Sequence, residues 1–142
     1  MVRILVVDDD PGIREMLHSM FECVGYNVLE AANGIEALKT LHSSEEQLVV
    51  LLDLTMPHMD GMDVLHAVAA DTQLATRHSY ILVSASRDLA TLHTNSTITA
   101  LSVPIIQKPF AMKQLVALVA NAAKRLEHPD EVPSPTRLKK SF

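Results

Sequence analysis

The sequence predicts an α/β protein, a doubly wound sandwich of three layers in which helices cover both faces of a parallel β-sheet. Short apolar runs rich in β-branched residues alternate five times with segments of helical periodicity. A single helix between two strands carries the chain back across the sheet, so the strands lie parallel. With 142 residues, of which 48% are hydrophobic, the chain is long enough for one compact domain with its own core.

The first strand and the first helix are predicted close to the N-terminus. Residues 4–7 are apolar and end in acidic residues, which predicts a fully buried strand. A helix is predicted after Pro11, because apolar residues then recur three and four positions apart, and Gly25 is placed to end it. The apolar face of this helix consists of Ile13, Met16, Leu17, Met20, Phe21 and Val24.

The next two predicted strands flank a second helix. Residues 26–30 predict a strand, and Asn33 then stands at an N-cap position with Glu36 three residues on, the arrangement of a capping box. This helix takes its apolar positions from Ile35, Leu38 and Leu41. Residues 48–52 form the most hydrophobic stretch of the chain and stop at Asp53, which predicts a central strand covered by helices on both sides.

The second half of the chain continues the alternation. Residues 81–83 and 103–106 predict the fourth and fifth strands. Residues 89–99 are expected to be helical from their place in the order, although several threonines lower the helix propensity there. The other two helices are marked by their apolar positions, which are Met62, Leu65, Val68 and Ala69 in one and Met112, Leu115, Val116, Val119, Ala122, Ala123 and Leu126 in the other.

The predicted domain spans residues 1–127. From residue 128 the sequence is polar, contains several prolines and lacks periodicity, so residues 128–142 are expected to be a disordered tail or the start of a linker. The apolar run near the N-terminus is too short for a signal peptide or a membrane span. We therefore expect a cytoplasmic location without a membrane partner.

The charged and metal-ligating residue types argue against several classes of function. The net charge of −5 contains no long block of one sign, which argues against direct binding of nucleic acid. Cys23 is the single cysteine, so no internal disulfide can form. The seven histidines lack the spacing of metal ligands and are interpreted as solvated surface imidazoles.

Groups that suit a cation-assisted phosphate site follow three of the predicted strands. The first strand ends in Asp8, Asp9 and Asp10, the third ends in Asp53, and the fifth is followed by Lys108. Because doubly wound folds bind ligands at the carboxyl ends of their strands, we expect these groups to converge. Clustered carboxylates repel each other, and Mg²⁺ relieves that repulsion while leaving positions for water and phosphate oxygens. The alternative is that such acids cap the following helices, an interpretation that fits Asp10.

Four motifs stand in order along the chain: ILVVDDD, LLDLTMPHMDG, ILVSAS and IIQKPF. In order and spacing they resemble the receiver domain of two-component response regulators, over about residues 1–127. The resemblance implies a flavodoxin-like fold, with five parallel strands in the order 2-1-3-4-5 and five helices. It also implies a phosphorylation switch that is not an enzyme beyond its own phosphorylation and dephosphorylation. Its partners would be a histidine kinase or phosphotransfer protein as donor and a downstream protein that reads the switch.

The resemblance assigns a role to each residue of the acid cluster. Asp53 is the nucleophile that takes the phosphoryl group, while Ser84 and Lys108 each bind a phosphoryl oxygen. The implied cofactor is Mg²⁺, and its protein ligands would be Asp8 (directly or through water), Asp9, Asp53 and the backbone carbonyl of Thr55. The resemblance also implies that the loop beyond the nucleophile is shaped by Pro57, Asp60 and Gly61. The Lys108–Pro109 bond is expected to be cis.

The expected output side departs from the family's pattern. Receivers commonly have an aromatic residue three positions before the lysine, where this chain has Ile105. The small Gly-Ala turn that commonly precedes it is replaced by residues 99–102. Because isoleucine is β-branched and stiff, we expect the signal to run through the loop after Ser84 and the threonine-rich segment that follows.

Two other functions compete with the phosphorylation switch. One is a receiver-like adaptor that no longer depends on phosphate, which Ile105 favours and the complete set of site residues disfavours. The other is an enzyme with an aspartyl-phosphate intermediate, such as a haloacid-dehalogenase-type phosphatase. Those enzymes place a second aspartate two residues after the nucleophile, where this chain has Thr55.

Overall fold

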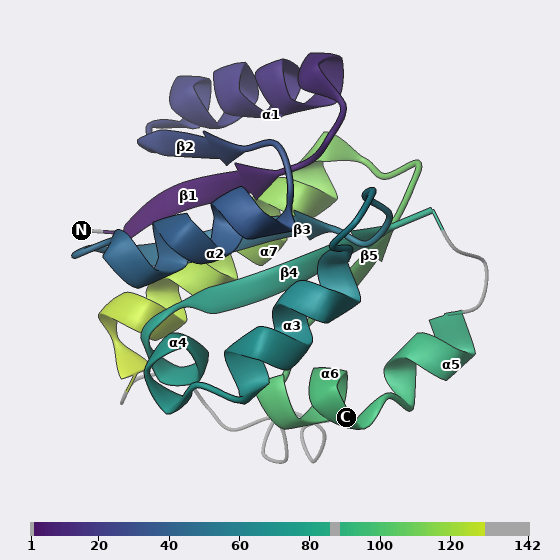
Figure 1. Ribbon diagram of the computed structural model, residues 1–142. Helices are drawn as coiled ribbons and strands as arrows, with labels where there is room; N and C mark the ends of the chain where they lie inside the picture. Colours follow the sequence, from purple (N-terminus) through teal and green to yellow (C-terminus); the bar gives the residue numbers. More distant parts are fainter. Residues whose placement is uncertain (1, 86–88, 130–142) are drawn as a thin grey trace, which may run out of the picture.

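The computed structural model describes residues 2–85 and 89–129, which form a three-layer sandwich (Figure 1). Its middle layer is a five-stranded sheet in which neighbouring strands pair in parallel, in the order β2-β1-β3-β4-β5. The strands are β1 (Val2–Val7), β2 (Val28–Ala31), β3 (Gln47–Asp53), β4 (Ser79–Ser84) and β5 (Ile105–Gln107). The predicted fold class and strand order are confirmed.

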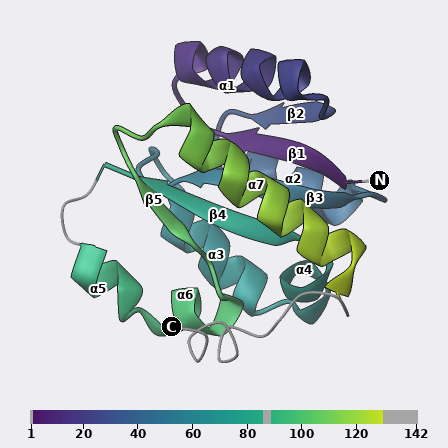
Figure 2. The same cartoon turned by 180° about the vertical axis from the view of Figure 1, so that it is seen from behind.

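Helices cover both faces of the sheet, with α1 and α7 on one face and the remaining helices on the other (Figures 1 and 2). The helices are α1 (Pro11–Val24), α2 (Gly34–Ser43), α3 (Gly61–Ala69), α4 (Thr72–Arg77), α5 (Leu89–His93), α6 (Ser96–Leu101) and α7 (Met112–Glu127). Two separate apolar cores result, one on each side of the sheet.

β3 lies in the centre of the sheet, and all of its residues after Gln47 are buried. Val49 and Leu51 pack in the core beneath α1 and α7. The intervening residues of the strand pack in the core on the other face, because successive side chains of a strand point in opposite directions. A strand with two buried faces needs apolar residues throughout, which explains the hydrophobic run that ends at Asp53.

The predicted caps of α1 are present, whereas the capping box predicted at the start of α2 forms only in part: the Glu36 carboxylate accepts a 3.1 Å bond from the side-chain amide of Asn33. The Asp10 side chain accepts hydrogen bonds from two backbone N–H groups in the first turn of α1. Gly25 ends this helix with a φ of 109°, a conformation that glycine adopts without steric cost. The Asn33 side chain accepts a hydrogen bond of 2.9 Å from the Glu36 N–H at the start of α2. The Asp10 and Asn33 caps fix the points at which α1 and α2 leave the carboxyl edge of the sheet.

The described residues contain seven helices, where five were expected. The sequence pattern did not predict α4, which has six residues and begins after the N-cap residue Asp71, because so short a helix has no resolvable periodicity. The helix predicted over residues 89–99 is instead two helices, α5 and α6. Asn95 separates them, because its side chain accepts hydrogen bonds from the N–H groups of Thr97 and Ile98 and so begins a new helix.

Two strands begin later than predicted. β2 begins at Val28, because the N–H of Tyr26 still bonds to the carbonyl of Phe21 in α1. β5 begins at residue 105, because the N–H of Val103 bonds to the carbonyl of Ile98 in α6. Four residues of the predicted apolar helix faces are exposed: Met16 (49%), Val24 (49%), Ile35 (53%) and Ala69.

The last helix, α7, ends at Glu127, where the sequence predicted the end of the domain. Most of the predicted tail, from residue 130 onward, lies outside the described residues. Within residues 2–85 and 89–129, every helix is too short or too polar to cross a membrane.

Candidate functional site

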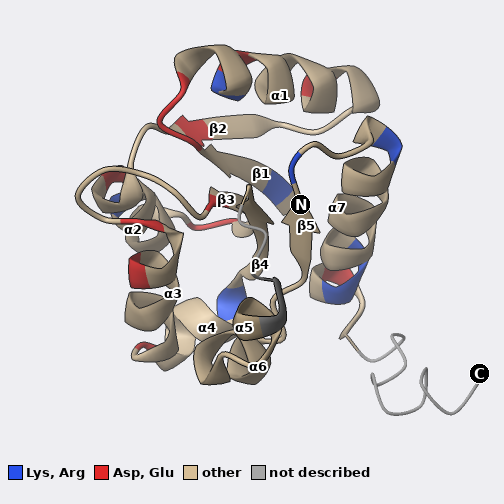
Figure 3. Ribbon diagram, turned by 90° about the vertical axis from the view of Figure 1, so that its right-hand side faces the viewer, with Lys and Arg blue, Asp and Glu red and all other residues tan. Residues whose placement is uncertain are grey.

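Three acidic side chains meet at the carboxyl edge of the sheet. Carboxylate oxygens of Asp8, Asp9 and Asp53 lie within 4.8 Å of one another. Figure 3 looks onto this edge, where acidic segments at the ends of β1 and β3 lie near a basic segment after β5. The structure therefore brings together the acids that the predicted topology placed at one edge.

Strand pairing explains why these acids meet. β1 and β3 are neighbours, with Val7 paired to Leu52, so Asp8 and Asp53 follow side by side. Asp8 and Asp53 are buried, with exposures of 4% and 6%, whereas Asp9 is exposed. Such a set offers a hard cation carboxylate ligands on one side and solvent on the other. Asp10 does not join the cluster; its side chain caps α1.

Lys108 brings a positive charge to the acid cluster. Its Nζ lies 3.4 Å from Oδ1 of Asp53 and 3.9 Å from Oδ2 of Asp8. Its backbone N–H donates a 2.8 Å hydrogen bond to the carbonyl of Ser84, which ties the residue to the end of β4. The Lys108–Pro109 peptide bond is cis, as expected.

Burial raises the pKa of both inner carboxyl groups above their ordinary values. At Asp53 the neighbouring Asp8 raises the pKa further, while Lys108 lowers it. At Asp8 a hydrogen bond from the Asp10 N–H and the charge of Lys108 lower the pKa, but burial raises it by more. The floor beneath these groups is apolar, lined by residues that include Val6, Leu51, Val83 and Phe110. Two buried carboxylates and one ammonium group leave an excess of negative charge that a divalent cation would compensate.

Ser84 and Thr55 flank the acid cluster. Ser84 is the last residue of β4 and is fully buried. Its neighbour Val83 pairs with Asp53, so Ser84 lies one residue beyond the acid on the adjacent strand. Thr55 is exposed, and its backbone N–H lowers the pKa of the Asp53 carboxyl group. The positions of Ser84 and Thr55 match the expectation, while their roles toward phosphate and metal stay predictions.

The loop after β3 returns to the backbone of Asp53. The Gly61 N–H donates a 2.9 Å hydrogen bond to the carbonyl of Leu54. A Cβ at Gly61 would lie 2.7 Å from the carbonyl oxygen of Asp53, so this close approach requires glycine. Asp60 caps α3 in a capping box with Asp63. Asp60 and Gly61 therefore shape this loop as expected.

A tight turn forms the middle of the same loop. The carbonyl of Pro57 accepts a 2.8 Å hydrogen bond from the Met59 N–H, and His58 between them has a φ of 69°. Met59 then covers the start of α2, where a Cβ at Gly34 would come within 2.6 Å of the Met59 Cγ. The loop is therefore packed against α2 as well as against the backbone of Asp53.

Ile105, the residue that departs from the family's pattern, lies in the edge strand β5 and pairs with Leu82. Its side chain is partly buried and packs on the same core as α3 and α6. The residue therefore acts as an apolar packing group at the sheet edge.

One histidine contradicts the prediction that all seven lie at the surface. His78 is only 3% exposed, and burial lowers its pKa. Its Nδ1 lies 3.0 Å from the N–H of Leu48 and its Nε2 lies 3.3 Å from the carbonyl of Leu41. Because His78 stands just before a strand, in a segment without periodicity, the sequence pattern gave no signal of its burial. The sequence pattern gave no sign of Arg14 either, whose side chain donates a hydrogen bond to the backbone carbonyl of Asp8 in the turn after β1.

Comparison with protein-family models matches residues 4–120 to the response regulator receiver domain. The matched stretch contains the acid cluster, Ser84 and Lys108.

Curated relatives with similar sequences are response regulators. The chain is 36% identical over 132 residues to the response regulator MprA of Mycobacterium sp. strain KMS, which covers 93% of this chain and 54% of MprA. It is 34% identical over 125 residues to the DNA-binding response regulator MtrA of Mycolicibacterium smegmatis, which covers 88% of this chain and 52% of MtrA. The chain spans about half the length of the curated relatives it matches.

Solved structures with the same fold include response regulators from two further organisms. The response regulator protein TrrA of Thermotoga maritima, solved in complex with Mg(2+)-BeF, is 31% identical with a TM-score of 0.72, covering 86% of this chain and 99% of that chain. The chemotaxis protein CheY4 of Vibrio cholerae is 25% identical with a TM-score of 0.73, covering 86% of this chain and 98% of that chain. The likeness therefore extends over nearly all of the described residues.

Proposed function

The chain belongs to the response regulator receiver domain family of two-component signalling, and we propose that it is a phosphorylation switch whose phosphoacceptor is Asp53. The observation that carries this proposal is the meeting of three acids and a lysine at one edge of the sheet. Among the acids, Asp53 ends the central strand and has the shorter distance to Lys108, 3.4 Å against 3.9 Å for Asp8.

In the proposed reaction a carboxylate oxygen of Asp53 attacks the phosphorus of the donor. The bond between phosphorus and the donor's leaving atom breaks, and its electron pair stays with the leaving atom. The product is an acyl phosphate, whose phosphoryl group carries roughly −1.5 to −2 charges at neutral pH in place of the single charge of the carboxylate. Lys108 supports the attack, because its ammonium group already lies 3.4 Å from Oδ1 of Asp53. From there it can form an ion pair with a phosphoryl oxygen of the product.

We propose Mg²⁺ as the cofactor, with Asp8, Asp9, Asp53 and the carbonyl of Thr55 as its protein ligands. The bound cation would neutralise charge on the phosphoryl oxygens. The donor set supports this choice, because hard cations prefer oxygen ligands and Mg²⁺ retains several waters. Asp9, which is exposed, leaves room for those waters.

The proposed output begins at Ser84. A new phosphoryl group offers acceptor oxygens to the Ser84 hydroxyl, which would draw the end of β4 and the loop after it inward. We expect a histidine kinase or phosphotransfer protein to be the donor and a separate protein to read the change. The family supports a cytoplasmic location and a regulatory role without catalysis on other substrates. The relative MtrA is a DNA-binding regulator. For this chain we propose that no direct contact with nucleic acid occurs, because its net charge is −5.

Mass spectrometry after incubation with acetyl phosphate and Mg²⁺ tests the phosphoacceptor. The parent is expected to gain one phosphoryl group and the Asp53→Asn variant none. Asp71→Asn is a matched control, because asparagine also caps helices and Asp71 caps α4 away from the site. A full yield of adduct on Asp53→Asn would overturn the assignment.

A calorimetric titration with Mg²⁺ tests the cofactor. The parent is expected to bind the ion and Asp9→Ala to bind it far more weakly, because Asp9 is a proposed ligand. A parent protein that shows no binding at millimolar Mg²⁺ would contradict the metal site.

We also propose that residues 1–127 form the complete receiver fold. Among the described residues, the last one that packs in either core is Leu126, just before the proposed cut after Glu127. The melting temperature and the yield of phosphorylation are expected to stay at the parent's values. A truncated protein that unfolds would show that residues after Glu127 are a packed element.

A further inference from the structure

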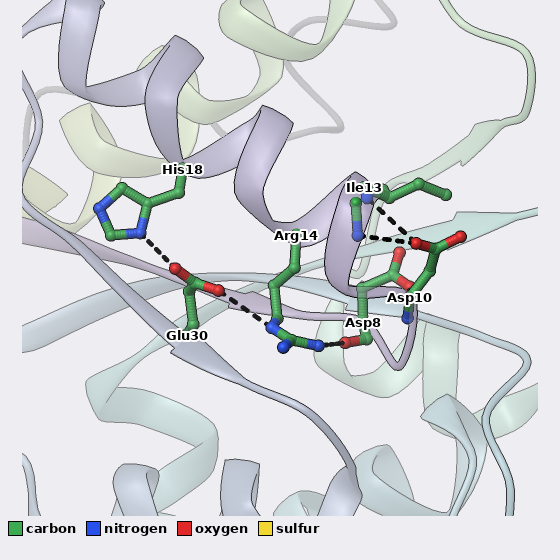
Figure 4. A network of polar contacts seen from close by, with 7 residues as sticks. Asp8, Asp10, Ile13, Arg14, His18 and Glu30 are labelled. Atoms are coloured by element: carbon green, nitrogen blue, oxygen red, sulfur yellow. Dashed lines mark hydrogen bonds and ion pairs between the residues drawn. The ribbon is translucent and has the colours of Figure 1, made fainter.

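Arg14 on α1 binds the backbone of the turn that carries Asp8 and Asp9. Its Nη1 donates a 2.8 Å hydrogen bond to the backbone carbonyl of Asp8, and its Nε donates a 2.9 Å bond to Oε1 of Glu30 on β2 (Figure 4). The arginine side chain is 18% exposed. It therefore connects the first helix, the second strand and the end of β1.

The orientation of Arg14 is itself fixed from the far side. The other carboxylate oxygen of Glu30 lies 2.6 Å from Nδ1 of His18 (Figure 4). Nε2 of the same imidazole lies 3.2 Å from Oε1 of Glu22. A guanidinium that uses two nitrogens on two different partners has little rotational freedom left. The chain of contacts therefore holds the Nη1 donor against Asp8.

Three hydrogen bonds hold Asp8, a proposed metal ligand, in the turn after β1. The Asp8 N–H donates to the carbonyl of Ala31 at 3.2 Å, and the Asp8 carboxylate accepts a 2.9 Å bond from the Asp10 N–H. The Arg14 bond holds the carbonyl that lies between these two contacts. A rotation of that peptide would displace the Asp10 N–H and with it the Asp8 carboxylate.

We propose that Arg14 is a positioning residue for the metal site, which fixes the Asp8 carbonyl and thereby aims the carboxylates of Asp8 and Asp9 at the cation. The inference rests on the proposed function, because it assigns Arg14 to the same Mg²⁺ site. Residues that orient metal ligands typically change metal affinity by roughly 10- to 100-fold when they are substituted. Arg14 does this through the backbone and so leaves the carboxylate oxygens free for the ion.

Arg14→Lys separates position from charge, because lysine keeps the positive charge but cannot donate to Asp8 and Glu30 from one planar group. Calorimetric titration with Mg²⁺ is expected to give a dissociation constant about tenfold above the parent's. Glu30→Gln is expected to weaken binding in the same direction, and the double variant to be no weaker than Arg14→Lys, because both residues act through one contact. Arg125→Lys on the exposed end of α7 is the matched control and is expected to bind like the parent.

Phosphorylation by acetyl phosphate distinguishes a positioning role from a direct one. Arg14→Lys is expected to react slowly at low Mg²⁺ and at the parent's rate when Mg²⁺ saturates. A dissociation constant within about twofold of the parent's would overturn the inference, since ligand-orienting residues have larger effects. A slow rate that persists at saturating Mg²⁺ would also overturn it.

Amide hydrogen exchange keeps this inference distinguishable from the proposed function. In Arg14→Lys without metal, the Asp10 amide is expected to exchange faster, because the Asp8 peptide is no longer held. If the parent binds no Mg²⁺, the proposed function fails, and faster exchange at Asp10 would still support Arg14 as the residue that holds the turn. Unchanged exchange at Asp10 would overturn the positioning role in either case.

Discussion

The ammonium group of Lys108 lies 3.4 Å from Oδ1 of Asp53, although β4 separates the strands on which the two residues depend. The side chains are 26% and 8% exposed, so the pair lies at the margin of the protein interior, where salt screens charges less than at the surface. The flexible stem of the lysine lets its charge move a short way without a change in the backbone. Lys108 therefore already faces the position at which new negative charge would appear.

The metal-free protein is expected to gain stability when Asp53 is changed to Asn. Burial, and then the Asp8 charge, raise the pKa of Asp53, so the folded state binds its proton more tightly than the unfolded state does. The stability that this provides is present at acid pH and is lost as the pH rises through the folded pKa. At about pH 7, Asp53→Asn should therefore raise the melting temperature by a few degrees.

Thermal melts with a chelator at about pH 7 and about pH 4 measure this effect, and the gain should shrink at the lower pH, where the parent carboxyl binds a proton. Asp71→Asn serves as the control and should change little at either pH. If Asp53→Asn melted below the parent at neutral pH, the lost pair with Lys108 would outweigh the relieved repulsion.

Gly61→Ala is expected to damage both stability and phosphorylation. The new Cβ would lie 2.7 Å from the carbonyl oxygen of Asp53 and 2.9 Å from the Cα of Leu54, and backbone atoms cannot swing aside. Overpacking of this kind costs roughly 1–3 kcal/mol, which urea denaturation would measure. The rate of phosphorylation should fall as well, because the displaced backbone carries Asp53.

Gly12→Ala is the matched control for Gly61→Ala, since its Cβ would meet only the tip of the Asp10 side chain, at 3.3 Å. Equal stability of Gly61→Ala and the parent would show that the loop after β3 can move away from Asp53.

His78 is expected to make the protein less stable in mild acid. The N–H of Leu48 can only donate, so Nδ1 of His78 must accept and Nε2 must carry the proton that points at Leu41. Both bonds require the neutral imidazole, and burial lowers the pKa of His78. Its contribution to stability is thus present at neutral pH and is lost as the pH falls toward the folded pKa.

His78→Gln should therefore be less stable than the parent by roughly 1–3 kcal/mol at about pH 7, because a buried N–H loses its acceptor. The difference should narrow at about pH 5, where histidines become charged. His42→Gln, at an exposed position of α2, is the control. A constant difference between the two pH values would mean that His78 does not protonate in this range.

Hydrogen exchange with a beryllofluoride mimic of the phosphoryl group locates the output. We expect the largest change within residues 84–101, because α5 and α6 have only five and six residues and such short helices are marginally stable. The edge strand around Ile105 should change less, since a β-branched side chain has few rotamers. A change centred on Ile105 that leaves residues 84–101 unaffected would contradict this route.

The sheet and the acid cluster could be predicted because their signals are local. The run before Asp53 is apolar on both faces, and a strand of that kind has one place in a doubly wound fold. Once the strands are ordered, the residues that follow them must share an edge, so the meeting of Asp8 with Asp53 requires no knowledge of side-chain packing.

The parts that the sequence analysis missed depend on contacts between distant segments. His78 is buried because Leu41 and Leu48, 37 and 30 residues away, present a carbonyl and an N–H to it. The break between α5 and α6 depends on whether Asn95 caps a new helix or continues an old one, and the same residue type permits both. Short periodic patterns contain neither kind of information.

The bond between His78 and Leu48 has a mechanical consequence for the strand that carries Asp53. β3 pairs with β1 and β4 along its length, and His78 holds the N–H near its start. A slide of the strand toward that end would draw the carboxylate of Asp53 into an apolar interior, at a high cost in free energy. When negative charge is added at the end of β3, we therefore expect the neighbouring loops to move and the strand itself to keep its register. The amino ends of the strands are the side on which a fused tag or a surface tether would leave the switch undisturbed.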